Sequence, residues 1–408
     1  MDSQPVRRYL DSAATSWPKP EAVLAASSAA ARSVGAAAGR GTHQAAQAAD
    51  RMRRLARRRA ADLLGGVDPS RVVLPAGGTL GLNIAIHGVL QPGDRVIATA
   101  ADHNASLRPL HFLAKRGEIE LAIVRCDNRG WVDPAAIERA WRPATRLVVC
   151  SHAANVTGMV QDAAAIADIT HSRGGLLLLD AAQTLGQIPC GVPGYGADIV
   201  VAPAHKWLQG PSGAAILWVR EGIDLVPLVQ GGTGTQSDSL EMPEAFTDRM
   251  EPGTPDLPAL AGLAAAVEWL ERFSISAVAA HCRSLAQAAA DGLRAVAGVR
   301  VIGGGQVGVP IVSFTAEGYD PAELALLLEQ LAGIEARAGY HCAARVHEHL
   351  GTATGGTLRV SFGPFNTEED VAILVETVGQ LLQTSLSSSV AGDLASDLPS
   401  RSIPPWQK

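Results

Sequence analysis

The stretch LLLLD (176–180) sets four consecutive leucines before an aspartate, and AAQ follows directly. An unbroken apolar run of this length is typical of a strand covered on both faces, as in a parallel sheet flanked by helices. Ligands of such open α/β sheets bind beyond the carboxyl ends of the strands. The run therefore predicts the fold class, and it places Asp180 and Gln183 where a ligand would bind.

Six further short apolar runs alternate with helical stretches such as 104–116 and 162–173. This alternation predicts an α/β fold with a mostly parallel seven-stranded sheet and helices on both faces. We assign it to a large domain spanning residues 15–255. The six runs are VVLP (72–75), RVIAT (95–99), LAIV (121–124), RLVVCS (146–151), DIVVA (198–202) and AAILWV (214–219).

Beyond the large domain the pattern changes to two long helical stretches, 256–273 and 276–298, followed by shorter strand and helix patterns. We expect a smaller α+β domain built from residues 1–14 and 256–383. The last segment, 384–408, is rich in serine and proline and has no periodicity, so it is predicted to be a disordered tail.

The composition excludes several classes of function. The 408 residues carry a net charge of −6, and the five cysteines are scattered without CxxC spacing. This argues against a disulfide framework or a metal site and favours a reducing compartment.

The basic run RMRRLARRR (51–59) fits a solvated helix face better than a nucleic-acid patch. No stretch approaches the ~18 apolar residues of a membrane span. We therefore expect a soluble, cytoplasmic protein with no nucleic-acid or membrane partner.

The stretch DIVVAPAHKWLQGPSG (198–213) places His205 and Lys206 just past a strand. Lysine is rarely buried without a role, and desolvation would lower its pKa and leave a free amine as the nucleophile for a Schiff base. A lone lysine here is commonly a surface residue, and Asp180 alone would serve equally well as a helix N-cap. Lys206 and Asp180 together favour a cofactor site.

Two further strand ends add to this site. In PAGGTLGLN (75–83), Gly78 and Thr79 open a helix, where backbone N–H groups bind anions. In ADHNAS (101–106), His103 offers a ring, although a lone histidine is commonly structural. An anion cradle, an aromatic platform, a carboxylate and an amine are the parts that pyridoxal phosphate needs. No GxGxxG opens the first βαβ unit, which argues against a nicotinamide cofactor.

The order of nine stretches resembles the class V aminotransferase family, and within it the cysteine desulfurase and selenocysteine lyase branch. The likeness extends to about residue 383 and implies the fold type I of pyridoxal-phosphate transferases. The stretches are YLDSAATSWPKP (9–20), GGTLGLN (77–83), ADHNAS, SHAANVTG (151–158), LLDAAQ (178–183), PAHKWLQGPSG (203–213), EPGTPDLPAL (251–260), RAGYHCA (337–343) and TLRVSFGPFNTEEDV (357–371).

The resemblance implies roles around pyridoxal 5′-phosphate. Lys206 would carry the cofactor as a Schiff base and, with His103, take part in catalysis. Asp180 would pair with the ring nitrogen, Gln183 would bond the ring hydroxyl oxygen, and His103 would stack on the ring. The phosphate contacts would come from Gly78, Thr79 and His205, and from Thr254 of the other subunit of a homodimer.

The resemblance also implies that Cys342 is the catalytic nucleophile of a cysteine desulfurase. Its thiolate would take the sulfur of L-cysteine as a persulfide, leave L-alanine, and pass the sulfur to a protein acceptor. Asn155 and Arg359 would bind the substrate carboxylate, since a guanidinium pairs with it bidentately. We expect Arg337, His341 or Arg359 to help lower the thiol pKa.

Alternatives remain open at this point. A C–S lyase, epimerase or transaminase would keep Lys206 and Asp180 without needing Cys342. A selenocysteine lyase would act on a substrate that differs from L-cysteine in one chalcogen atom only, and a binding protein that kept the fold would take up no cofactor. Pro203 stands where many desulfurases have a serine, and it offers no phosphate hydroxyl. An isolated cysteine is commonly a small buried hydrophobe, and we expect this of Cys126, Cys150, Cys190 and Cys282.

Overall fold

The computed structural model describes residues 6–36, 38, 41–188 and 192–390. Within them, seven strands form one sheet in the order β2-β8-β7-β6-β5-β3-β4. Of these seven strands, β8 runs in the direction opposite to the other six. The predicted mostly parallel seven-stranded sheet is confirmed. Its strands are β2 (Val72–Val73), β3 (Arg95–Thr99), β4 (Glu120–Val124), β5 (Thr145–Ser151), β6 (Leu176–Asp180), β7 (Ile199–Pro203) and β8 (Ala215–Val219).

Both faces of this sheet are covered, which explains the run of leucines. Side chains alternate along a strand, so Leu177 and Leu179 pack with α2, α5, α6 and α8, while Leu176 and Leu178 pack on the opposite face with α3, α4 and α7. All four leucines are at most 7% exposed. The helices are α2 (Gln44–Leu63), α3 (Gly78–Val89), α4 (Asn104–Lys115), α5 (Pro134–Ala140), α6 (Ala163–Ser172), α7 (Phe246–Met250) and α8 (Leu257–Phe273).

The basic run 51–59 lies on α2, as a helix face should, but it is not solvated throughout. Arg57 is buried, donates to the Val72 carbonyl oxygen at 2.6 Å and pairs with Glu251 at 2.8 Å. This part of the run therefore ties α2 to the edge of the sheet instead of facing water.

The smaller domain contains a second sheet, ordered β12-β13-β10-β9, with all neighbours antiparallel. The N-terminal strand β1 pairs with β11, so the start of the described chain joins this domain. Its elements are β1 (Arg8–Tyr9), β9 (Val299–Ile302), β10 (Ile311–Ala316), β11 (Ile334–Glu335), β12 (Arg337–Gly339), β13 (Thr357–Ser361), α10 (Pro321–Ala332), α11 (Ala344–Leu350) and α12 (Glu368–Val390).

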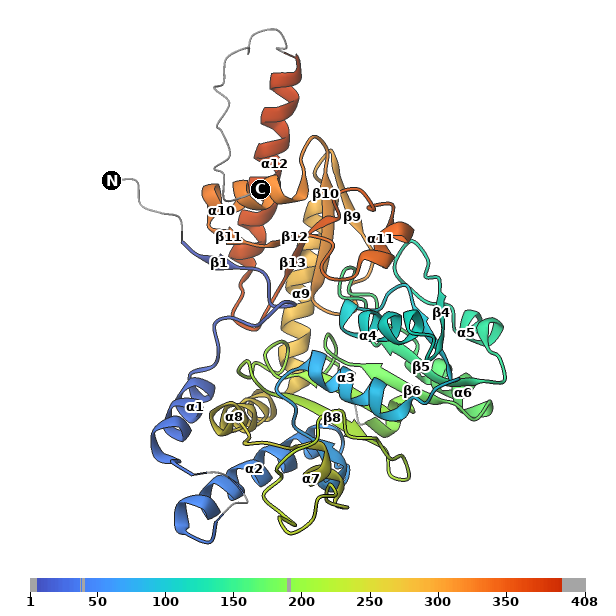
Figure 1. Cartoon of the computed structure of the whole chain (residues 1–408). Coiled ribbons are helices and arrows are strands. Elements are labelled where there is room, and N and C mark those ends of the chain that lie inside the picture. The colour runs from blue at the N-terminus through green and yellow to red at the C-terminus, as the bar shows by residue number, and fades with distance from the viewer. Residues whose placement is uncertain (1–5, 37, 39–40, 189–191, 391–408) are drawn as a thin grey trace, which may run out of the picture.

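The helix α9 (Ile275–Arg294) packs in the cores of both domains. Figure 1 shows α9 running from beside the large sheet toward the end of the molecule that carries α10 and α12. Val278 and Cys282 of α9 pack in the core of the large domain, whereas Leu285 and Leu293 pack in the core of the small one. The whole of α8 packs on the large domain, together with α1 (Glu21–Ser33). The division of the chain at 255/256 stays a prediction.

The end of the described chain differs from the predicted tail. The helix α12 continues to Val390, past residue 383, so the first part of the serine-rich segment is helical. Residues 391–408 of the predicted tail lie outside the described residues. Nowhere in the described part of the chain is a helix long and apolar enough to cross a membrane.

Gly186 tests how tightly the segment that directly follows Lys206 is packed. Its φ is +93°, and a Cβ there would lie 2.5 Å from the Trp207 carbonyl oxygen. We expect Gly186→Ala to lower the free energy of unfolding by roughly 2–4 kcal/mol, because it adds a steric clash to the cost of a left-handed backbone. Urea unfolding followed by circular dichroism measures this loss.

Gly174→Ala is the matched control, since Gly174 has φ +77° but nothing within 4 Å of a Cβ. We expect Gly174→Ala to lower the free energy of unfolding by only about 1 kcal/mol, the cost of placing alanine in a left-handed backbone conformation. Equal losses in the two variants would show that the contact with Trp207 imposes no constraint.

Candidate active site

One pocket lies at the carboxyl ends of three adjacent strands. Ser151, Asp180 and Pro203 end β5, β6 and β7, and all three line it. Because strand side chains alternate, Asp180 faces the same side as Leu176 and Leu178, toward α3 and α4. The N-termini of these helices close the pocket. Of the predicted site residues, those that line it are Gly78, Thr79, His103, Asn155, Asp180, Gln183, His205 and Lys206.

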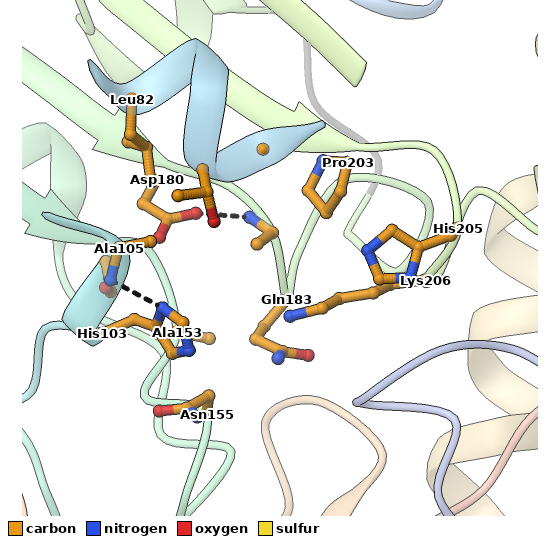
Figure 2. Close-up of a pocket in the computed structure, with 14 residues that line it drawn as sticks. Leu82, His103, Ala105, Ala153, Asn155, Asp180, Gln183, Pro203, His205 and Lys206 are labelled. Atoms are coloured by element: carbon orange, nitrogen blue, oxygen red, sulfur yellow. Dashed lines mark hydrogen bonds between the residues drawn. The ribbon is translucent and has the colours of Figure 1, made fainter. Parts of the chain in front are cut away.

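Asp180 and Lys206 enter this pocket from neighbouring strand ends (Figure 2). Asp180 is buried, and its Oδ1 accepts a hydrogen bond from the Ala182 backbone N–H at 3.0 Å. Burial raises the pKa of Asp180, and the Lys206 ammonium opposes the rise. Burial lowers the pKa of Lys206 to about 8, an effect that Asp180 partly offsets. The site therefore holds a carboxylate beside an amine that is neutral far more often than an ordinary lysine.

His103 is fixed as the N-cap of α4. Its Nδ1 accepts a hydrogen bond from the Ala105 backbone N–H at 3.0 Å, which leaves the ring proton on Nε2. Burial lowers the pKa of His103 to about 3, with Lys206 contributing, so the ring is neutral at physiological pH. A neutral, fixed ring at this position can lie against a second aromatic ring.

An anion can bind where α3 begins. The cap residue Gly77 gives no side-chain hydrogen bond, so the N–H groups of the first turn remain available beside the Thr79 hydroxyl. A Cβ on Gly78 would lie 3.3 Å from Pro203, so a glycine here allows the helix to start close to the end of β7. Pro203 lines the pocket but has no hydroxyl to donate, as the sequence predicted.

The peptide before Lys206 is anchored by the N-terminal segment. The His205 carbonyl oxygen accepts hydrogen bonds from the Ser16 backbone N–H at 2.8 Å and from Lys19 Nζ at 2.9 Å. Gln183 is anchored as well: its Oε1 accepts from Trp207 Nε1 at 2.7 Å and its Nε2 donates to the Ala13 carbonyl at 3.1 Å. One Nε2 hydrogen of Gln183 is left for a ligand.

Arg359 reaches the pocket region from β13 of the small domain. It is 1% exposed, and it donates to the Asn155 carbonyl at 3.0 Å and to Asp11 Oδ1 at 2.8 Å. Arg359 Nε and Asn155 Oδ1 are buried and have no hydrogen-bond partner among the described residues. Buried polar atoms without partners are costly, so these two atoms mark a place for a polar ligand.

Cys342 lies on the turn between β12 and α11 and is exposed, unlike the other described cysteines, Cys126, Cys150 and Cys282. Cys190 lies outside the described residues. Cys342 borders a surface hollow together with Thr79, His103 and Ala105, and these last three also line the Lys206 pocket. The two hollows therefore adjoin.

The Cys342 turn is held at several points. His341 and Cys342 both have left-handed backbones, with φ of 51° and 59°. Asn155 Nδ2 donates to the His341 carbonyl at 2.7 Å, and the Asn104 backbone N–H donates to the Cys342 carbonyl at 2.8 Å. The nucleophile candidate is thus exposed without lying on a loose loop.

Of the three expected helpers of the thiol, Arg337 is the one that makes a hydrogen bond to it, from Nη2 to Sγ at 3.3 Å. His341 turns away instead: it is buried, and its Nε2 contacts Thr357 Oγ1 at 2.9 Å. Among the three candidates, Arg337 is therefore the one that the geometry favours as a direct helper of the thiol.

The comparisons with known proteins agree with this arrangement. The family model described as aminotransferase class-V matches residues 8–374. This chain belongs to that family. The predicted resemblance is confirmed.

Several cysteine desulfurases are similar to this chain. A probable cysteine desulfurase of Methanothermobacter thermautotrophicus is 32% identical over 380 residues, which are 91% of this chain and 94% of that protein. The cysteine desulfurase CsdA of Escherichia coli is 31% identical, covering 92% and 94%. The apo structure of a cysteine desulfurase from Thermococcus onnurineus NA1 matches with a TM-score of 0.85 at 27% identity, covering 92% and 94%.

Two carboxylates of this chain were missed by the sequence reasoning, the buried Asp102 and the partly buried Asp11. Asp102 accepts hydrogen bonds from the backbone N–H groups of Thr99 at 2.7 Å and Ser151 at 2.5 Å, and so ties the end of β3 to the end of β5. Burial raises the pKa of Asp102 to about 7. The strand-end rule that found His103 would also have found Asp102. Asp11 gave no such signal, because only the tertiary fold brings it to Arg359.

Alkylation of Cys342 tests the contact with Arg337. We expect Arg337→Gln to slow alkylation by iodoacetamide at neutral pH by roughly 3- to 10-fold, because the reacting thiolate loses a cation within hydrogen-bond distance. Mass spectrometry of the Cys342 peptide over time measures the rate. Arg345→Gln is the control, since Arg345 is exposed and pairs with Glu348. Equal rates in all three proteins would show that Arg337 does not act on the sulfur.

Proposed function

We propose that the chain is a pyridoxal-phosphate-dependent cysteine desulfurase, which converts L-cysteine to L-alanine and transfers the sulfur through a persulfide on Cys342 to a protein acceptor. The observation that carries the proposal is the exposed Cys342 on a fixed turn, next to the pocket of Lys206 and in contact with Arg337. Relatives named cysteine desulfurase that cover over nine tenths of the chain support it.

The donor set of the pocket fits pyridoxal 5′-phosphate. A buried carboxylate with a backbone donor suits a protonated ring nitrogen, and an amine of lowered pKa suits a carbonyl carbon. When bound, this cofactor withdraws electrons from the substrate Cα. The residues that would hold it are Gly78, Thr79 and His205 at the phosphate, His103, Asp180 and Gln183 at the ring, and Lys206 at the carbonyl carbon.

The chain's own groups then have distinct tasks. Arg359 Nε, which has no partner among the described residues, and the second N–H of Asn155 Nδ2, whose first donates to the His341 carbonyl, would bind the substrate carboxylate. Lys206 Nζ would accept the Cα proton, because its lowered pKa favours the neutral amine. Asp180 would hold the proton on the ring nitrogen.

Cys342 would perform the sulfur transfer. Its thiolate would attack the substrate sulfur; an S–S bond forms as the Cβ–S bond breaks, and the electron pair of that bond goes to the substrate carbons. Protonation at Cβ and return of the Cα proton from Lys206 then give alanine. Arg337 would hold the thiolate before attack. Exposure of Cys342 leaves the persulfide within reach of an acceptor.

A homodimer belongs to this proposal. Thr254 does not line the Lys206 pocket but a separate surface hollow, beside Leu228 and Val229, which are 40% and 54% exposed. Exposed apolar side chains gathered at a hollow favour a protein interface. A second copy covering this face would carry Thr254 to the phosphate site of its partner.

The described cysteines are unpaired, which favours a cytoplasmic location.

Substitution of Cys342 tests the reaction. With L-cysteine and a reductant, we expect equimolar sulfide and alanine from the wild type and a loss of about 100-fold or more in Cys342→Ala, because the variant lacks the nucleophile. Pyridoxal-phosphate absorbance should be the same in both. Cys126→Ala, a buried cysteine outside the pocket, should keep its activity. Undiminished sulfide release by Cys342→Ala would exclude nucleophilic desulfuration and favour a C–S lyase.

The pH dependence of cofactor loading tests Lys206. A neutral amine is needed, and the pKa of about 8 means that the neutral fraction grows about tenfold per pH unit below pH 8 and levels off above it. We expect the rate of covalent loading of the cofactor-free protein to follow this curve. Borohydride reduction at timed intervals with peptide mapping measures it. A rate still climbing at pH 10 would mean that Lys206 titrates as an ordinary lysine.

A further inference from the structure

Asp11 is held against Arg359 by its backbone as well as its side chain. The residue forms a β-bridge with Ser361, two positions beyond Arg359 on β13. Its carbonyl oxygen accepts hydrogen bonds from the backbone N–H groups of Ala14 at 3.0 Å and Thr15 at 3.3 Å. Its carboxylate accepts from Arg359 Nη2 at 2.8 Å. The contact is therefore built into the turn that follows β1.

The same guanidinium is the group that would bind the substrate carboxylate, so any role of Asp11 in ligand binding rests on the proposed function. Arg359 is 1% exposed and the Asp11 side chain 19%. Arg359 Nη1 is committed to the Asn155 carbonyl, Nη2 to Asp11, and Nε has no partner among the described residues. The buried Arg359 guanidinium is thus already paired with the Asp11 carboxylate before any ligand binds.

Two carboxylates on one guanidinium repel each other. Burial lowers the pKa of Arg359 and Asp11 opposes this, so the fixed carboxylate stabilises the charged arginine in the ligand-free protein. A substrate carboxylate arriving at Nε gains less than it would from an unpaired arginine, because much of the charge is already compensated. The repulsion acts on every ligand that carries a carboxylate, the product included.

We propose that Asp11 sets the carboxylate affinity of the site: it compensates the buried charge of Arg359 in the ligand-free protein and weakens the binding of substrate and product carboxylates alike. The opposite role is that Asp11 merely positions Arg359 for the substrate. The two roles make opposite predictions, since removing the Asp11 charge strengthens carboxylate binding in the first case and weakens it in the second.

Asp11→Asn removes the charge and keeps the shape. In the enzyme loaded with pyridoxal 5′-phosphate, calorimetric binding of L-alanine should strengthen roughly tenfold, and the KM for L-cysteine should fall by a similar factor. The variant without amino-acid ligand should melt at a lower temperature, because Arg359 is left buried without a counter-charge. Binding of L-alaninamide, which has no carboxylate, should not strengthen.

Glu335→Gln is the matched control, because it removes the carboxylate of the surface pair Arg7–Glu335 on the neighbouring strand β11. It should leave the binding of L-alanine unchanged. A folded Asp11→Asn protein that binds L-alanine equally or more weakly would overturn the inference. Asp11→Ser provides a second uncharged variant. Failure of both variants to fold would also overturn it, because Asp11 would then be needed for the structure itself.

These outcomes are separate from those of the desulfurase assay. A wild type that releases no sulfide from L-cysteine, with an Asp11→Asn variant that still gains affinity for L-alanine, would remove the proposed reaction and keep the role of Asp11. Sulfide release by the wild type without tighter L-alanine binding by the variant would support the proposed reaction and exclude the proposed role of Asp11. A wild type that binds no L-alanine would overturn both.

Discussion

The site depends on a buried carboxylate and a buried amine at the ends of two adjacent strands. The register between β6 and β7 pairs Asp180 with Val201, and Lys206 follows a few residues beyond the end of β7. Burial disfavours the charged form of each group, and each partly restores the charged form of the other. That balance requires a rigid sheet that excludes water from both faces, and the unbroken leucines of β6 supply it.

The small domain brings further charge to this balance. On β12 and β13, Arg337 and Arg359 stand directly opposite each other, an arrangement that costs stability in an antiparallel pair. The two arginines have different partners: Arg337 contacts the Cys342 sulfur, and Arg359 contacts Asp11. A loss of stability of this kind is typical of functional sites, where residues are placed for their chemistry and not for the best local packing. Because Arg359 has Asp11 as its partner, the N-terminal segment that carries Asp11 must pack on β13.

The sequence predicted those parts of the structure that local patterns control. Strands buried on both faces leave continuous apolar runs, which marked the strands of the large sheet, and the partly exposed edge strand β4 was found through its apolar run LAIV. The strand-end rule found Asp180, His103 and Lys206. The short strands β1, β11 and β12 leave no apolar run and were missed. The contact of Asp11 with Arg359 joins residues 348 positions apart, which no local pattern encodes. Cys342, Asn155 and Arg359 came from family resemblance, since no strand pattern marks them.

The Cys342 turn shows how exposure and fixed geometry can coexist. A thiol that receives sulfur inside a pocket and passes it to an outside acceptor must be exposed, and exposed turns are ordinarily mobile. Here two consecutive left-handed residues, which store strain, are held by the buried His341 and by hydrogen bonds to both carbonyls of the pair. Asn155 makes one of these bonds, and its own carbonyl accepts from Arg359. The residue that would help bind the substrate carboxylate therefore also fixes the backbone of the proposed nucleophile, so substrate position and sulfur position depend on the same side chain.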